Sequence, residues 1–547
     1  MKSNDQCSLS RHSTGSWQLL SDTVLGMALL LAIISCESQK KTSEYLADDY
    51  GITICGTVQY TGNCSPETDS LVHLGLALIH HMTYDEAETI FDKVITSNPE
   101  CIWGPWGKAM SYIHPLWGDQ PTEIQMQTGW EMAEKCGVLA NGDKELAFAE
   151  AIAGYYREGI KSPLADRLRN WNGAWEKAYR DFPEDMEIKS FYALSLIAVA
   201  DPKDKTYTNQ LLAGELAQEV LREIPDHPGG FHYTIHAYDY PELAEKAKTA
   251  ADNFSKIAPQ VAHALHMPSH IFTRLGMWEE SVEWNRRSAE AAKKSSPSRV
   301  SLHFLHAKDY IVYALLQQMK DREVIEELKE IEGLQGSIEM HPASAYALAS
   351  CEARYALERH NWKLAEDILP RKGKNIDWEI FPEFEALSHF AIGLGAARSG
   401  DIKKAQIASK TLLSLSEKIK NPYWSGQVKV QTLTVNAWTE FAKGNKTKAL
   451  ELMEEAEKRE RATNKHPITP GELLPASELL ADMYLELDMP KEALKHYELA
   501  LDRSPERFNS LQGAAKAAEM TANTELFNHY NKKLSTLTKN AQIVASL

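Results

Sequence analysis

The chain has 547 residues, of which 43% are hydrophobic and 25% are charged, a composition typical of folded protein and long enough for several domains or one extended array. The formal net charge of −17 leaves no basic stretch that could neutralise a run of phosphates, so we expect no nucleic acid among its partners. The sequence contains no HExxH, Gly-x-Ser-x-Gly or Gly-rich phosphate-loop motif, so it lacks the familiar signals of hydrolases and nucleotide-binding proteins.

An apolar run at residues 24–36 is short for a bilayer-spanning helix and is typical of the core of a signal peptide. It ends in Ile-Ile-Ser-Cys, which resembles the lipobox of bacterial lipoproteins. The resemblance implies a signal peptide over residues 1–36, acylation of Cys36 and a location on a periplasm-facing or cell-surface membrane. An uncleaved signal anchor or a start assigned upstream of a shorter leader is the alternative. Residues 37–65 would form a stalk and a short amino-terminal segment.

The next segment has the spacing of a helical-hairpin repeat. In residues 68–101, Leu74-Gly75, Ala87, Phe91 and Pro99 stand at the offsets of a 34-residue unit, and residues 68–101 resemble a tetratricopeptide repeat (TPR). Residues 474–507 show the same offsets, and the segments between them follow the pattern more loosely. We therefore predict an all-α fold, a TPR-like α-solenoid of about ten or eleven helical hairpins over residues 66–545.

Four longer motifs resemble those of one group of bacterial TPR proteins. They read "WGKAMSYIHPLWG", "HPGGFHYTIHAYD", "HALHMPSHIFTRLGMW" and "LPASELLADMYLEL", and the resemblance covers residues 55 to about 530. The last motif departs from the usual form at Ser477, where arginine is expected. The resemblance implies the fold, and it implies no reaction.

Four cysteines lie early in the chain, and export would place them in an oxidising compartment: Cys55, Cys64, Cys101 and Cys136. They lack the paired Cys-x-x-Cys spacing of a zinc ribbon. We predict a disulfide between Cys64 and Cys101, because these two flank the first repeat near the starts of successive first helices. A bond between Cys55 and Cys64 is the alternative.

Eight of the 19 histidines fall between His227 and His306, and their register is more telling than their number. Within the helices that we expect, they share faces in three groups: His232, His236 and Asp239; His263, His266 and His270; His303 and His306, followed by Asp309.

These groups lie on the first helices of three successive hairpins, which start near Gly229, Val261 and Leu302. First helices line the concave side of a TPR array, so we expect the histidines to face a common groove. Pro268 should kink the second of these helices, since proline removes one helical hydrogen bond and clashes with the carbonyl of Ala264.

Three uses fit such a groove. A divalent transition metal is the candidate cofactor, with His232, His236, His266 and His270 as ligands, Asp239 as a ligand or as an acceptor behind one, and His306 closing the groove. A neutral histidine beside Asp239 or Asp309 could instead act as a general base. The third use is recognition of a polar ligand by the histidines and neighbouring tyrosines.

The alternative for each single histidine is a half-buried packing role. His80 and His81 are expected to end a helix and interact with its dipole. Trp117, after His114, could stack on a ligand or hold a loop in place.

Two classes of function remain open on this basis. The first is a lipid-anchored scaffold that binds a protein or peptide in the concave groove and contacts the membrane through its anchor. The second is a metal-binding protein or a metalloenzyme that uses the histidines; catalytic residues, and whether there is a reaction, stay open. A carbohydrate-binding role for the tryptophans is a distant third.

Overall fold

The computed structural model describes residues 55–62, 64–117, 119–371 and 376–543. Cys36, the predicted signal peptide over residues 1–36 and most of the predicted stalk lie outside the described residues. Helices make up most of this part of the chain, and its strands are two short parallel partners, β1 (Arg299–Val300) and β2 (Ser337–Ile338). The fold class is all-α, as predicted. Within the described part of the chain, no helix combines the length and hydrophobicity needed to cross a membrane.

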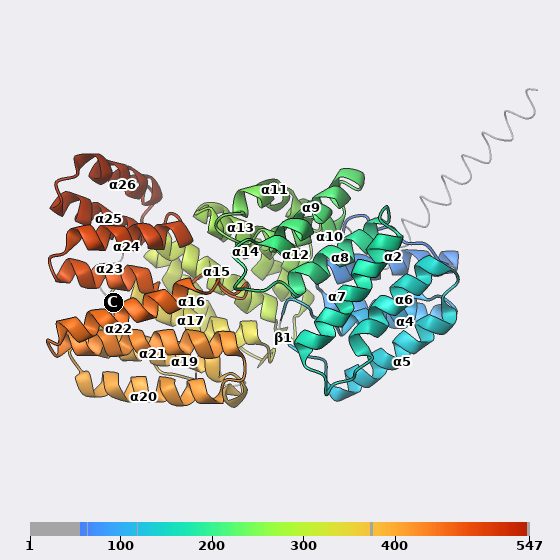
Figure 1. Cartoon of the computed structure of the whole chain (residues 1–547), viewed down its shortest axis with the longest axis horizontal. Helices are drawn as coiled ribbons and strands as arrows, with labels where there is room; N and C mark the ends of the chain where they lie inside the picture. The colour runs from blue at the N-terminus through green and yellow to red at the C-terminus, as the bar shows by residue number, and fades with distance from the viewer. Residues whose placement is uncertain (1–54, 63, 118, 372–375, 544–547) are drawn as a thin grey trace, which may run out of the picture.

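The amino-terminal hairpins lead up to the histidine-rich region, as blue to green ribbons in Figure 1. They pair α2 (Pro66–His80) with α3 (Tyr84–Ser97), α4 (Trp103–Ser111) with α5 (Glu123–Leu139), α6 (Asp143–Tyr156) with α7 (Leu164–Asp181), α8 (Met186–Ala198) with α9 (Thr208–Glu223), and α10 (Pro228–Ala237) with the 3₁₀ helix η1 (Ala244–Ala247) and α11 (Lys248–Ile257).

The remaining hairpins continue the same alternation. They pair α12 (Ala262–His266) and α13 (Pro268–Arg274) with α14 (Trp278–Ser295), α15 (Leu302–Gln317) with α16 (Asp321–Glu332), α17 (Pro342–Glu358) with α18 (Trp362–Glu366), α19 (Pro382–Ser399) with α20 (Ile402–Lys418), α21 (Pro422–Ala442) with α22 (Lys446–Arg461), α23 (Ala476–Glu486) with α24 (Pro490–Arg503), and α25 (Phe508–Met520) with α26 (Thr524–Leu537). A second 3₁₀ helix, η2 (Trp378–Ile380), precedes α19. The described residues thus form twelve hairpins, slightly more than the sequence suggested.

The small and aromatic residues of the repeat pattern lie where neighbouring helices cross closely. Phe91 of α3 is fully buried, and its ring lies so close to Gly75 of α2 and Gly107 of α4 that a Cβ at either glycine would stand 2.6 Å or less from a ring atom. Gly513 of α25 and Tyr497 of α24 repeat this contact in the last hairpins. Glycine is therefore needed where one helix crosses an aromatic ring of the next.

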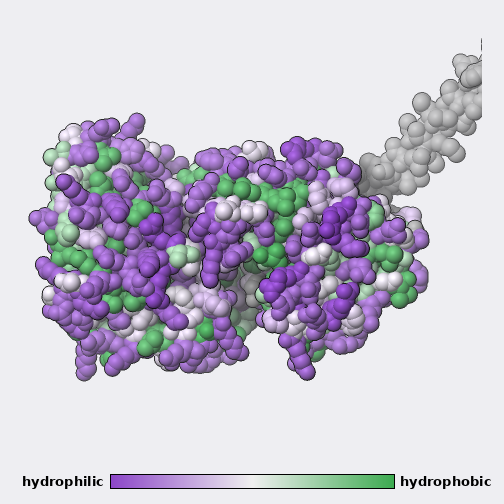
Figure 2. Space-filling view, in the orientation of Figure 1, coloured by the Kyte–Doolittle hydropathy of each residue, from purple (hydrophilic) through white to green (hydrophobic). Residues whose placement is uncertain are grey.

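Two hydrophobic cores organise the described chain, one formed by buried residues between 58 and 272 and the other by residues between 262 and 530. They meet at α12 and α13, near the centre of Figure 1. Figure 2 shows a mostly hydrophilic face with separated hydrophobic areas, as expected when each helix buries one side against its neighbours. The histidine-rich segment therefore lies at the junction of the two cores.

The carboxy-terminal repeats return to the middle of the array. Tyr310 of α15 donates to the carbonyl of Pro467 at 3.1 Å, and Arg354 of α17 donates to the carbonyl of Gly471 at 2.8 Å. Arg507, at the start of α25, pairs with Glu358 of α17 at 2.7 Å. The array is therefore less extended than the solenoid we expected from sequence, and the segment between α22 and α23 covers part of its inner side.

Candidate metal centre

Pro268 interrupts the helix that carries the central histidines. Helix α12 ends at His266 and α13 begins at Pro268, so the break falls where the sequence predicted a kink. Helices α10, α12–α13 and α15, each the first helix of its hairpin, bring their histidines together near this break. Six rings, each at most 9% exposed, form two neighbouring groups: His232, His236 and His263, which we name the α10–α12 triad, and His266, His270 and His306, which we name the α12–α15 triad.

In the α12–α15 triad, one nitrogen from each ring lies within 4.8 Å of the others. The Nε2 atoms of His266 and His270 are 3.0 Å apart. The Nδ1 of His270 contacts the Asp239 carboxylate at 2.9 Å, and the Nδ1 of His266 contacts the Asn285 side-chain oxygen at 2.7 Å. The Asn285 amide nitrogen donates to the Ser281 carbonyl at 2.7 Å, which fixes its oxygen toward His266.

These contacts determine where the ring protons lie. Carboxylate and amide oxygens only accept, so each Nδ1 of His266 and His270 must carry the donated proton. In a neutral imidazole the other nitrogen then has a lone pair, and the two lone pairs face each other over 3.0 Å. Such a pair needs a shared proton or a metal ion between the rings.

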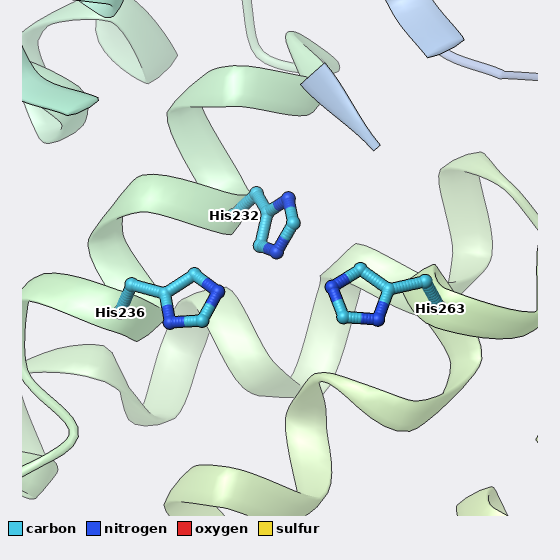
Figure 3. Close-up of side chains that lie close together, drawn as sticks. All are labelled: His232, His236 and His263. Atoms are coloured by element: carbon cyan, nitrogen blue, oxygen red, sulfur yellow. The ribbon is translucent and has the colours of Figure 1, made fainter. Parts of the chain in front are cut away.

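The α10–α12 triad has a different signature (Figure 3). Figure 3 shows His236 and His263 pointing toward each other, with His232 beside the space between them. The Nδ1 of His232 donates to the His80 carbonyl at 2.6 Å. Among the described residues, no hydrogen-bond partner exists for Nε2 of His232, Nε2 of His236 or either ring nitrogen of His263, and all four atoms are buried.

Burial keeps these rings neutral. It holds the pKa of His232, His263, His266 and His306 well below the usual histidine range and lowers that of His236 to about 3. Burial also lowers the pKa of His270, although Asp239 opposes the shift. Neutral imidazole is the form that binds a metal ion, so the rings are in their ligating state at neutral pH.

Asp239 lies behind the α12–α15 triad. Its Oδ2 atom contacts His270 and lies 3.5 Å from Nζ of Lys465, whereas its Oδ1 atom accepts from Nε of Arg274 at 2.8 Å. Burial acts to raise the pKa of this carboxyl, but Lys465, Arg274 and His270 together lower it well below the usual range. Asp239 is thus ionised and is placed as the acceptor behind His270.

Asp309 does not contact the histidines, which removes it as the partner of a general base. Its carboxylate accepts from Nε of Arg354 at 2.8 Å and from Ser350 at 2.7 Å. The sequence register placed Asp309 one turn beyond His306, but the Asp309 side chain pairs with α17. Of the two carboxylates considered for that role, only Asp239 meets a histidine.

A small cavity of about 30 Å³ opens onto both triads, and its walls include His236, His263, His270 and His306. Trp117 lies against this region, with its ring centre 5.2 Å from that of His263. The other side is closed by residues 466–468 from the segment between α22 and α23. The cavity has room for about two water-sized ligands.

A third group, His80, Glu187 and His227, escaped sequence analysis because its members come from α2, α8 and the start of α10. Here every ring nitrogen has a partner. His80 contacts Tyr233 and Glu187, and His227 contacts Glu187 and accepts from the Gly230 amide. His80 ends α2, as we expected, and its ring is in addition part of a satisfied buried network that packs α2 on α10.

The structure divides the predicted ligand set. His232 and His236 lie in one triad, whereas His266 and His270 lie in the other with His306. The helix register groups His263 with His266 and His270, and the predicted ligand set omits it, whereas the structure places His263 with His232 and His236. The sequence offered one indication of this division: His263 and His266 are three residues apart in a short helix that breaks at Pro268, so their rings can point to opposite sides.

The structure joins Cys64 to Cys101, with their Cα atoms 4.7 Å apart, and Cys55, Cys136 and Cys351 are free among the described cysteines. Formation of this bond in the protein itself stays a prediction, which non-reducing peptide mapping checks. His114, another candidate from sequence, contacts Asp119 at 2.6 Å and stacks on Tyr84, outside both triads.

No protein-family profile and no curated protein sequence matches this chain. Among solved structures, yeast Tom70 is 13% identical over 84% of this chain and 89% of that one, with a TM-score of 0.28. A human IFIT1 dimer with PPP-AAAA is 14% identical over 86% of this chain and 89% of that one, with a TM-score of 0.37. Identities and TM-scores this low do not support a conclusion about function. The exclusion of nucleic acid that we expect from the net charge therefore stays a prediction.

Proposed function

We propose that this protein is an exported, lipid-anchored helical-repeat protein that binds a late first-row transition metal ion at the α12–α15 triad. The observation that carries the proposal is the 3.0 Å separation of the His266 and His270 Nε2 atoms, whose Nδ1 atoms both face oxygen acceptors. Two adjacent ligands at about 2.0–2.1 Å from one ion lie about 2.8–3.4 Å apart, for ligand–metal–ligand angles from about 90° to tetrahedral. An ion between the rings would therefore use both lone pairs.

A shared proton is the other way to satisfy this pair. It would place an imidazolium in a site where burial lowers the pKa of both rings, so the proton is disfavoured at neutral pH. A metal ion has a third nitrogen available from His306. Asp239 and Asn285 supply the acceptors that commonly orient ligating histidines. All-imidazole ligation suits zinc, copper, nickel or iron rather than magnesium or calcium.

To test this, each purified protein is loaded with copper or zinc and dialysed exhaustively, and its metal content is then measured. We expect a His266→Phe/His270→Phe variant to lose an ion that wild type retains, because phenylalanine fills the space without a nitrogen. His496→Phe is the matched control, since this ring lies on α24 beside Glu457. Wild-type and control proteins without retained metal would contradict the proposal.

Export and anchoring are supported by the lipobox-like sequence that ends at Cys36. An acyl chain on that residue would hold the folded array at a membrane surface without a spanning helix. We expect a fatty-acid analogue to label wild type and to leave Cys36→Ala unlabelled. Equal labelling of the two proteins would rule out acylation at Cys36.

Binding of a protein or peptide is a second proposal, supported by the TPR-like fold, since such arrays commonly bind partners on extended surfaces. The six histidines are not available for it, because each of their side chains is buried. A partner would have to use the solvent-exposed faces.

A further inference from the structure

We infer that the α10–α12 triad binds a second metal ion, so that the two triads form one dinuclear centre with histidine ligands only. The inference rests on the proposed function for the first ion, at the α12–α15 triad. Its own support comes from different atoms, the ring nitrogens of His232, His236 and His263.

The first support is the set of unsatisfied nitrogens. Nearly all buried polar groups in folded proteins have a hydrogen-bond partner, so each exception requires an explanation. Four exceptions fall on three rings here: Nε2 of His232, Nε2 of His236 and both ring nitrogens of His263. One nitrogen from each ring lies within 4.8 Å of the others. A single ion would satisfy three of these atoms at once.

The second support is the proton on His232. Its Nδ1 donates to the backbone carbonyl of His80 at 2.6 Å, which leaves the lone pair on Nε2. A backbone carbonyl behind a ring is a common arrangement for a ligating histidine. The free lone pair of His232 therefore points away from α2 and into the triad.

The group formed by His80, Glu187 and His227 provides a contrast inside the same molecule. It is at least as buried and similarly compact, yet each of its ring nitrogens has a protein partner. Such a group holds helices together without an ion. The α10–α12 triad lacks these partners, and that difference separates a ligand set from a packing network.

The two triads are close enough to act as one centre. The ring centres of His236 and His270 are 5.8 Å apart, and those of His263 and His266 are 6.0 Å apart. Both triads line the same cavity, which has room for about two water-sized ligands. Dinuclear sites hold their ions about 3.5–4 Å apart, often with a small ligand between them.

The charges nearby restrict what the centre holds. Among the described residues, Asp239 is the one carboxylate within hydrogen-bonding distance of a ring in either triad, and it is already paired with Arg274 and close to Lys465. The protein therefore does not balance the charge of two divalent ions. A hydroxide or another small anion in the cavity would do so, and two monovalent copper ions would need less compensation.

The experiment uses the purified full-length chain, loaded separately with copper and with zinc and dialysed to constant metal content. We expect two ions per chain for wild type, one for His263→Phe, one for His306→Phe and none for the double variant. His496→Phe, outside both triads, should retain two. Equal helical content and equal melting of the metal-free proteins would exclude misfolding as the cause of any loss.

Copper also reports whether the two ions share the cavity. Two copper(II) ions joined by a bridging ligand couple magnetically, so wild type should give an EPR signal that integrates to fewer spins than its copper content. Each single variant should give the full signal of one ion. Wild type with one ion, unaffected by His263→Phe, would overturn the dinuclear centre and leave the first site intact. Wild type with two ions and a full two-spin signal would also overturn it, whereas no bound metal would overturn both proposals.

Discussion

Asn285 and Asp239 each accept a hydrogen bond from a buried histidine whose other nitrogen faces the α12–α15 triad. They set both the ring orientation and the position of the proton, two properties that a ligand needs before a metal arrives. Asn285 has no charge, so its removal separates orientation from electrostatics. Asp239 also pairs with Arg274, and its replacement would leave a buried cation without a partner.

We expect Asn285→Ala to weaken metal binding at the α12–α15 triad by about 10–100-fold, because His266 loses the acceptor that fixes its tautomer. The number of ions bound at saturation should not change. Competition titration against a chelator of known affinity measures the effect. Ser288→Ala is the matched control: Ser288 lies one turn further along α14 and donates to the Ala262 carbonyl at 2.7 Å without touching a ring. An equal loss of affinity in both variants would contradict this prediction, because it would show that the substitutions act by shifting α12 rather than through the His266 tautomer.

A second residue-level prediction concerns Glu460, which is 4% exposed near the end of α22. Burial raises the pKa of its carboxyl, and the neighbouring charge of Glu472 raises it further. Above the ordinary pKa of glutamate, the unfolded chain releases this proton while the folded protein retains it. The contribution of Glu460 to the free energy of unfolding therefore falls as pH rises, by up to about 1.4 kcal/mol per pH unit.

Glu460→Gln removes this titration and keeps the oxygen that accepts from the Ala476 amide at 2.8 Å. We expect the variant to be more stable than wild type, with a gain that grows from pH 5 to pH 7. Denaturant unfolding at several pH values measures it. Glu455→Gln, on the outer side of the same helix, should show little change. A gain that is constant with pH would contradict the raised pKa of Glu460.

The residues of the centre were only partly predictable. Register placed His232 with His236 and His266 with His270, because residues three or four apart share a helix face. It could not place Asn285, which contacts His266 across one hairpin, because ring direction within a hairpin depends on packing. It also could not place Glu187, whose contact with His80 joins helices 107 residues apart. It also could not show that the four histidines divide between two triads, since ring direction depends on the break at Pro268 and on packing.

At the scale of elements, the segment between α22 and α23 is the feature that the repeat pattern missed. Its backbone carbonyls bind to Arg354 of α17, which donates to Gly471 at 2.8 Å and to Glu472 at 2.9 Å. The hairpins themselves were predictable, because small and aromatic residues recur at fixed offsets. The path of this segment was not, because it depends on contacts with residues more than a hundred positions earlier, such as Tyr310 and Arg354.

We expect Arg354→Met to destabilise the protein by about 3–5 kcal/mol, because Asp309 then stays buried without its cation. The double variant Arg354→Met/Asp309→Asn should recover part of this loss, since it removes the isolated charge. The segment 462–475 should become sensitive to protease in both variants, because the contacts to Gly471 and Glu472 are lost in each. Chemical denaturation and limited proteolysis measure the two effects. Protease resistance in both would show that Arg354 does not hold the segment.

At the scale of the whole molecule, the proposed centre lies between two hydrophobic cores. His266 and His270 belong to the helix break where the amino-terminal core ends, and His306 belongs to α15, whose apolar residues are in the carboxy-terminal core. Figure 1 shows these helices between the two halves of the array. An ion on the α12–α15 triad would therefore connect the cores. Sequence periodicity predicted one continuous array, and it does not reveal where such an array divides its hydrophobic contacts.

The last prediction follows from this position. A ligand that binds only the folded protein stabilises it by about 2.7 kcal/mol at a concentration 100 times its dissociation constant. For halves of roughly 150–250 residues, this corresponds to roughly 5–10 °C in melting temperature. We expect the metal-bound protein to unfold in one calorimetric transition and the chelated protein to show an additional, earlier one, because the cores lose their shared ligand set. His306→Phe should keep the additional, earlier transition whether or not metal is added, because its α12–α15 triad has lost one ligand. Metal should raise the melting temperature of this variant only as far as an ion bound at the α10–α12 triad can. That triad contains no residue of α15, so its ion does not connect the two cores. A wild-type melting profile that is identical with and without metal would show that the ion does not link the two cores.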